Sequence, residues 1–164
     1  MRLIFQEKIK SYREKNKPII YIDESGFAND MPRTHGYSEN GQRCYGTQDW
    51  GAKGRINAIG ALMDKRLLTV SLFDQNVNTE VFNSWMDKDL IPNLPKGSVV
   101  VMDNASFHKS AKMKDQIKLA GHILEYLPPY SPDLNPIEHK WAQAKSIRRK
   151  HLCDIDTLFR DFCT

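Results

Sequence analysis

Five short apolar runs, rich in β-branched and aromatic residues, stand out along the chain. They occupy residues 19–23, 56–63, 67–73, 98–103 and 123–127. Apolar runs of this length are typical of buried strands, so each run predicts one strand. Residues 64–66 form a polar turn that joins the second and third strands into a hairpin. Gly, Asn, Pro and Ser are scattered through residues 26–53, and this segment is expected to be irregular.

Other segments carry apolar residues at helical spacing among charged ones, which predicts amphipathic helices. Pro18, Pro92 and Gly121 end three of them, because proline and glycine disfavour a continuing helix. Thr79 is the expected N-cap of the second. The predicted helices cover residues 1–16, 79–90, 110–120 and 136–149, with a short helix from Asp156.

The order of elements predicts an α/β fold. The first three strands can pair as an antiparallel meander, and the last two are each reached across a helix, which implies parallel pairing. We therefore expect a mixed five-stranded sheet flanked by helices. The sequence has no repeat and no domain linker, so residues 18–164 are expected to form one domain behind a helical lead-in at 1–17.

Composition narrows the class of protein. The 164 residues are 40% hydrophobic and 27% charged, which is ordinary for a globular domain and excludes wholesale disorder. No apolar run reaches the ~20 residues of a membrane helix, and the N-terminus lacks a secretory signal. Three cysteines without a CxxC pair predict reduced thiols. A cytoplasmic protein without a membrane partner is expected.

The basic residues are concentrated in two helical segments. The chain has 24 Lys and Arg against 20 Asp and Glu, a net charge of +4. Five of the basic residues lie within 139–151, and four lie within 109–118 beside a single acid. Such segments fit a polyanionic partner, and they fit a pair of solvated helix faces equally well.

Two of the most apolar strands end in an aspartate, Asp23 and Asp103. A carboxylate that follows buried strand residues is costly to desolvate unless it is paired or binds a metal. If the two strands are neighbours, both carboxylates emerge at the same edge of the sheet. A cage of carboxylate oxygens suits Mg²⁺ or Mn²⁺ better than zinc. The alternative is that each aspartate only forms a turn at the end of its strand.

Glu138 is the candidate for a third oxygen ligand. It lies in the first turn of the helix at 136–149, whose start is fixed by a proline-rich loop. Asn135, Pro136 and Glu138 also match a capping box, with Asn at N-cap, Pro at N1 and Glu at N3. The local sequence favours capping and metal binding equally.

Four polar residues lie next to these carboxylates. Glu24 follows Asp23 on a strand and should point to the opposite face, which excludes it from the cage. Asn104 and His108 follow Asp103, and either could contact substrate or orient a carboxylate, although a lone histidine is more often structural. Asn135 is a further candidate of the same kind.

Three segments in order resemble the catalytic blocks of DDE transposases, in particular mariner-related bacterial insertion-sequence transposases. The segments are YIDESGF at 21–27, VMDNASFHK at 101–109 and YLPPYSPDLNPIE at 126–138. The 34 residues between Asp103 and Glu138 are typical of that group. Arg33 and the segments 36–37 and 41–43 are also similar to the family pattern.

The resemblance implies a ribonuclease-H-like fold in which Asp23, Asp103 and Glu138 bind two Mg²⁺ or Mn²⁺ ions. It implies a metal-dependent endonuclease that cleaves DNA at transposon ends and transfers the strand to target DNA. The expected partners are transposon-end and target DNA, a second copy of the chain in a homodimer, and a separately encoded DNA-binding subunit. The expected location is the bacterial cytoplasm, near the nucleoid. The family's N-terminal helix-turn-helix domains are expected to be absent, because the first strand begins close to Met1.

Basic residues on two segments are the candidates for DNA contacts, which would be salt-dependent and largely independent of sequence. One set lies on the helix that carries Glu138, and the other surrounds the segment after the first strand. The candidates are Lys140, Lys145, Arg148, Arg149, Arg33, Arg43, Lys53 and Arg55.

Two other functions stay open from the sequence. The first is a transposase remnant that binds DNA or dimerises without catalysis. The second is a related ribonuclease-H-like nuclease that acts on RNA–DNA hybrids or junctions.

Overall fold

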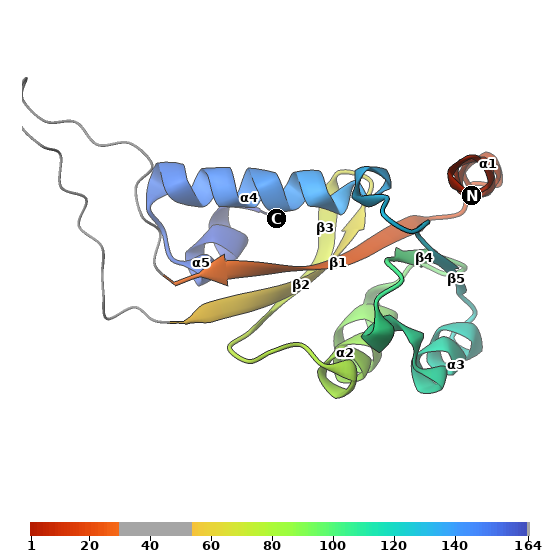
Figure 1. The fold of residues 1–164 in the computed structure, drawn as a ribbon, viewed down its shortest axis with the longest axis horizontal. Coiled ribbons are helices and arrows are strands. Elements are labelled where there is room, and N and C mark those ends of the chain that lie inside the picture. Colours follow the sequence, from red (N-terminus) through yellow and green to blue (C-terminus); the bar gives the residue numbers. More distant parts are fainter. Residues whose placement is uncertain (30–53, 164) are drawn as a thin grey trace, which may run out of the picture.

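Five strands form one mixed sheet in the computed structural model, which describes residues 1–29 and 54–163 (Figure 1). The strands are β1 (Ile19–Ala28), β2 (Arg55–Met63), β3 (Arg66–Phe73), β4 (Val99–Met102) and β5 (Ile123–Tyr126). Their order across the sheet is β3-β2-β1-β4-β5. The pairs β1–β2 and β2–β3 are antiparallel, and β1–β4 and β4–β5 are parallel. The predicted sheet is confirmed.

β1 is longer than the apolar run predicted, and the expectation of irregular structure is wrong for residues 26–28. Gly26 pairs with Asn57 and Ala28 pairs with Arg55, so β2 carries β1 five residues past Asp23. Phe27 is buried in the core at 1% exposure. The Arg55 side chain lies where a Cβ at Gly26 would be, which explains a glycine at this position.

The helices follow the prediction with small shifts at their ends. Thr79 is not the N-cap of its helix: Asn78 is, because its side chain accepts from Val81 N at 2.9 Å. The short helix likewise begins one residue earlier, after Asp154 as its N-cap. The helices are α1 (Arg2–Glu14), α2 (Thr79–Trp85), α3 (Ala111–Leu119), α4 (Ile137–His151) and α5 (Ile155–Thr157). Shorter helical turns are η1 (Met86–Leu90), η2 (Ile91–Asn93), η3 (Ser106–Lys109), η4 (Pro132–Leu134) and η5 (Leu158–Phe162).

Each face of the sheet carries its own hydrophobic core, because side chains alternate along a strand. Ile19, Tyr21 and Phe27 of β1 pack in one core with residues of α1, α4, α5 and η5. Ile20 and Ile22 pack in the other core with residues of α2, η1 and α3. Figure 1 shows α4 and α5 on one side of the sheet and α2 and α3 on the other.

None of the helices in the described ranges is both long enough and apolar enough to cross a membrane.

Candidate active site

Asp23 and Asp103 lie at corresponding places on two neighbouring parallel strands. Tyr21 of β1 pairs with Val101 of β4, and each aspartate comes two residues after its member of this pair. Alternation puts Asp23 on the same sheet face as Tyr21, which is the face that α4 covers. The sheet order places β1 beside β4, which meets the condition under which both aspartates emerge at the same edge of the sheet.

Glu138 reaches this place from the first turn of α4. The helix is fixed on the sheet by Ile137 and Trp141, both buried, and the ring of Trp141 lies so close to Gly60 that a Cβ there would clash. The side chain of Glu138 is exposed. The helix that carries Glu138 is therefore held by apolar contacts on its other side.

The predicted capping box does not form. The helix begins at Ile137 with Pro136 as N-cap and without a side-chain cap. The Asn135 side chain instead accepts from Ile137 N at a long 3.4 Å, which makes Glu138 the second helical residue and not the third. Glu138 is consequently free of the capping role that local sequence allowed.

All three predicted carboxylates line one cavity of about 390 Å³. The strand ends supply Asp23 and Asp103, α4 supplies Glu138, and the proline-rich loop after β5 forms the opposite wall. Two of the predicted neighbours, Asn104 and Asn135, line the same cavity. In this loop Tyr130 is fully exposed and has a φ of 53°, a left-handed backbone that is uncommon for a bulky residue.

Asp23 is the buried member of the three. Its exposure is 9%, and burial together with the negative charges of Glu24 and Glu138 raises the pKa of Asp23 to about 8. The carboxylate therefore sits where a proton or a cation is needed to balance its charge.

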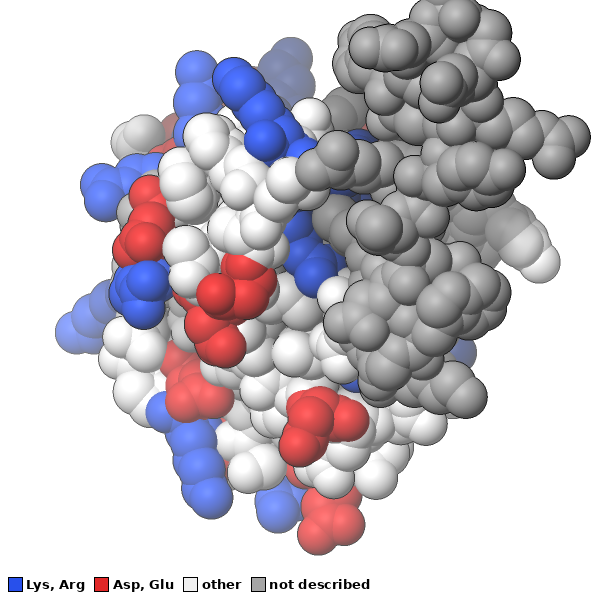
Figure 2. Space-filling model, turned by 90° about the vertical axis from the view of Figure 1, so that its left-hand side faces the viewer, with Lys and Arg blue, Asp and Glu red and all other residues white. Residues whose placement is uncertain are grey.

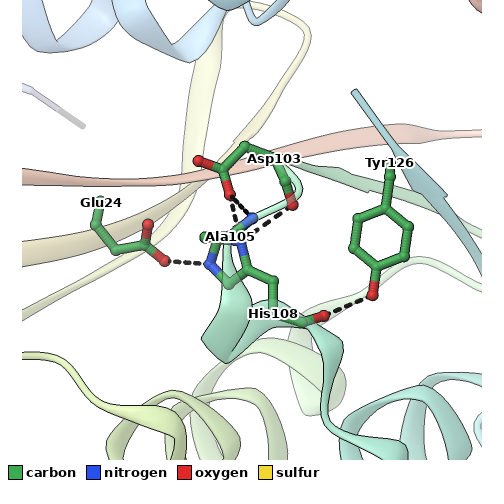
Figure 3. Close-up of polar contacts among 5 residues, drawn as sticks. All are labelled: Glu24, Asp103, Ala105, His108 and Tyr126. Carbon is green, nitrogen blue, oxygen red and sulfur yellow. Dashed lines mark hydrogen bonds and ion pairs between the residues drawn. The ribbon is translucent and has the colours of Figure 1, made fainter. Parts of the chain in front are cut away.

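Asp103 is oriented by hydrogen bonds to one of its oxygens. Its Oδ1 accepts from Ala105 N at 3.0 Å and lies 2.6 Å from His108 Nδ1 (Figure 3). The contact with His108 lowers the pKa of Asp103. The second carboxylate oxygen points away from the histidine.

His108 joins Asp103 to Glu24. The ring is completely buried, and its Nε2 lies 2.7 Å from Glu24 Oε1. Burial lowers the pKa of His108, but the hydrogen bonds to Asp103 and Glu24 outweigh that effect and raise it to about 9. Sequence reasoning placed Glu24 on the opposite face, which is correct, but missed its contact with His108. No signal in the sequence showed that η3 folds back beneath β1.

The residues that line the cavity fit a hard divalent cation such as Mg²⁺ or Mn²⁺. Three carboxylates supply anionic oxygen ligands, and two side-chain amides supply neutral oxygen ligands. In the described part of the chain, no three His, Cys, Asp or Glu side chains are already gathered at ligating positions. Asp23 is buried in this cavity, Asp103 is half-buried and Glu138 is exposed, so the three carboxylates reach the cavity from different depths.

Three of the predicted basic residues of α4 keep solvent-exposed surface. Arg149 is exposed, and Lys140 and Lys145 are half-buried, with Lys145 Nζ lying 5.4 Å from the ring centre of Phe27. Figure 2 views the end of the molecule where α4 finishes, and the described part of this face carries Lys and Arg with Asp and Glu among them.

Arg148 does not fit the prediction of a DNA contact. Its exposure is 6%, and its guanidinium donates to the backbone oxygens of Ala28 at 2.6 Å and Cys153 at 3.3 Å. It thereby ties the end of β1 to the turn after α4. Arg148 lies one and two helical turns after Ala144 and Trp141, and all three residues are buried on the same side of α4.

The other four predicted DNA contacts lie near the end of β1 or outside the described residues. Arg55 is exposed at the start of β2, over Gly26. Arg33, Arg43 and Lys53 lie outside the described residues.

Comparison with known proteins gives consistent matches. A model of the DDE superfamily endonuclease family matches residues 18–158. The Tc3 transposase of Caenorhabditis elegans is 28% identical over 132 residues, which are 76% of this chain and 40% of that protein. A solved Mos1 transposase paired-end complex with left transposon end has a TM-score of 0.72 at 18% identity, over 90% of this chain and 47% of that one. A Mos1 paired-end complex with Mg has a TM-score of 0.66 at 18% identity, over 87% and 46%.

The chain thus spans less than half the length of these relatives. The structural likeness confirms the predicted ribonuclease-H-like fold. The family model covers most of the sequence, including Asp23, Asp103 and Glu138. This chain therefore belongs to the DDE superfamily endonuclease family.

Proposed function

We propose that this chain is the catalytic part of a transposase, which cleaves DNA strands at transposon ends and transfers the freed 3′-hydroxyl to target DNA. The observation that carries the proposal is the meeting of Asp23, Asp103 and Glu138, from three segments far apart in the sequence, in one cavity. The cavity opens beside α4, where a DNA strand could approach. Membership of the family and similarity to the Tc3 transposase support the same activity.

Asp23, Asp103 and Glu138 would hold two Mg²⁺ or Mn²⁺ ions. Bound there, such ions supply activation of a water molecule and stabilisation of the leaving oxygen in phosphodiester cleavage. Asp23 provides a fixed, buried carboxylate, and Asp103 provides one whose direction is set by His108 and Ala105. Glu138 stands on a rigid helix opposite them and closes the set. Asn104 and Asn135 offer amide groups for a phosphate or sugar in the same cavity.

Basic residues on α4 and at the start of β2 would hold the DNA backbone. Lys145 and Arg149 follow Glu138 by two and three helical turns, so they extend from the cavity along α4. Lys140 and Arg55 are the other described candidates, and Arg33, Arg43 and Lys53 belong to the same proposal. Contacts of this kind bind phosphate and carry no sequence information directly.

The active assembly would contain two copies of the chain, because transposition joins two DNA ends and each end needs a catalytic site. Sequence-specific recognition of the ends would come from a separately encoded or additional DNA-binding part. The solved Mos1 transposase complexes hold paired ends, which supports the first of these points for a protein of the same fold.

The test is nicking of supercoiled plasmid DNA by the purified chain in Mg²⁺ or Mn²⁺. We expect metal-dependent nicking whose rate falls by more than about 100-fold in Asp103→Asn and in Glu138→Gln. This loss exceeds the one expected when a residue that only hydrogen-bonds to a metal ligand is replaced. Glu80→Gln is the matched control, because Glu80 is also exposed in the first turn of a helix but lines a different cavity. If both Asp103→Asn and Glu138→Gln kept the nicking activity of the wild type, these carboxylates would not form the active site.

A further inference from the structure

We propose that Glu24 is a positioning residue that acts through His108 to fix the direction of Asp103 for metal binding. The inference rests on the proposed function, because it takes Asp103 to be a metal ligand. It assigns a role to a carboxylate on the sheet face opposite the cavity.

The first support is the hydrogen bonding of His108. Its side chain has no exposed surface, and both ring nitrogens face carboxylates, Nδ1 at 2.6 Å from Asp103 Oδ1 and Nε2 at 2.7 Å from Glu24 Oε1. Nδ1 also lies 3.2 Å from the backbone oxygen of Asp103, and carboxylate and carbonyl oxygens both accept from a ring N–H. The ring therefore bridges Asp103 and Glu24 (Figure 3).

The second support is the packing that holds the ring in one orientation. The rings of Phe82 and Phe107 lie with their centres 4.5 and 4.4 Å from that of His108. The backbone oxygen of His108 accepts from the Tyr126 hydroxyl at 2.5 Å, which anchors the turn to β5. These contacts restrain the ring of His108 and the turn that carries it.

The consequence falls on Asp103. Its Oδ1 is occupied by His108 and Ala105, and the other oxygen is directed away from them. The side chain of Asp103 is 49% exposed, so without this restraint its carboxylate would rotate freely in solvent. Hydrogen bonds behind a ligating carboxylate are the usual means of holding it in the direction that a metal requires.

Glu24 supplies the partner that keeps His108 in this orientation. Without Glu24 the buried Nε2 has no hydrogen-bond partner, which favours a different orientation of the ring. Glu24 is the neighbour of Asp23 on β1, so two successive residues send one carboxylate to the metal cavity and the other to the restraint on Asp103.

The test measures Mn²⁺ binding by the EPR signal of free Mn²⁺, which does not depend on cleavage. We expect Glu24→Met to weaken Mn²⁺ binding by about 10–100-fold, the usual effect of losing an outer-shell partner. Glu24→Gln keeps an oxygen that accepts from Nε2–H and should stay within about threefold of the wild type. His108→Gln, a second route to the same loss, should weaken binding in the range of Glu24→Met.

Glu125→Met is the matched control. Glu125 is a strand carboxylate with 15% side-chain exposure against 17% for Glu24, and it accepts from Tyr12 and Lys8 outside the cavity. The Glu125→Met variant should be less stable than the wild type and should bind Mn²⁺ with the same affinity. If the role of Glu24 were purely structural, Glu24→Met would likewise lower stability and leave Mn²⁺ affinity unchanged.

A double substitution separates an effect through Asp103 from an independent one. If Glu24 acts through Asp103, adding Glu24→Met to Asp103→Asn should weaken Mn²⁺ binding no further. Wild-type affinity in a folded Glu24→Met or His108→Gln variant, or full additivity in the double variant, would overturn the proposal. Failure of the wild-type chain to bind Mn²⁺ would overturn the metal site itself, and the positioning role with it.

Discussion

Asp23 has the least favourable surroundings for a charge among the three carboxylates. It is almost fully buried, and Glu24 and Glu138 add negative charge nearby, whereas Asp103 is half exposed and hydrogen-bonded. The same residue that makes the cavity suited to a cation therefore weakens the fold when no cation is bound. This opposition between stability and function is common at sites that bind metals.

Replacing Asp23 with Asn should stabilise the metal-free protein at pH 8. The pKa of Asp23 is about 8 in the fold against an ordinary 3.8, so the unfolded chain ionises first as the pH rises. The free energy of unfolding of the wild type should fall between pH 4 and pH 8, and the variant is spared this loss. The gain at pH 8 should exceed about 1.4 kcal/mol, the value of one pKa unit.

Urea denaturation in EDTA at pH 5 and pH 8 measures this difference. Asp87→Asn, at an exposed acid of η1, serves as the control and should change little. A variant whose stability tracks that of the wild type at both pH values would show that Asp23 ionises without cost.

At the scale of elements, α4 carries a structural arginine together with the residues proposed for catalysis and for DNA binding, on different sides of the helix. Glu138 faces the cavity, Arg148 is buried against the end of β1, and Arg149 is exposed. Neighbouring arginines on one helix thus have opposite environments. Their substitutions should separate stability from DNA binding.

Arg148→Met should lower the free energy of unfolding by about 1–3 kcal/mol. The thioether keeps the apolar stem but leaves the backbone oxygens of Ala28 and Cys153 without their donor. Thermal and urea denaturation measure the loss. If Arg148→Met instead weakened DNA binding and left stability unchanged, Arg148 would be a DNA contact after all.

Arg149→Gln should leave stability unchanged and weaken binding to duplex DNA. Losing one phosphate contact should reduce the slope of log K against log salt concentration by about 0.9. Fluorescence anisotropy over a salt series gives both quantities. Lys10→Gln, at an exposed position of α1, should leave the slope as it is.

The strands, the helices and the three candidate carboxylates could be predicted from the sequence, whereas most contacts between side chains could not. The strand runs and the Asp23 and Asp103 positions follow from apolar patterning, which the sheet retains. The burial of Arg148 and the contact between Glu24 and His108 depend on how η3 and the end of α4 fold back, and alternation within one strand holds no information about either. The N-cap of α2 was predicted wrongly because Asn78 and Thr79 both favour this position and propensity alone does not decide between adjacent candidates.

At the scale of the whole molecule, the proposed assembly pairs two chains around DNA. The chain alone presents one cavity with the three carboxylates, and joining two ends requires two such cavities. With duplex DNA in Mg²⁺-free buffer, light scattering should give a complex that contains twice the 19.0 kDa mass of the chain. One chain per duplex at every protein concentration would contradict the paired assembly.

The most direct test of the central claim is an anomalous difference map from crystals of this chain soaked in Mn²⁺. We predict two peaks in the cavity, with Asp23, Asp103 and Glu138 as the coordinating side chains. Peaks that avoid these three carboxylates, or an empty cavity at saturating Mn²⁺, would contradict the account.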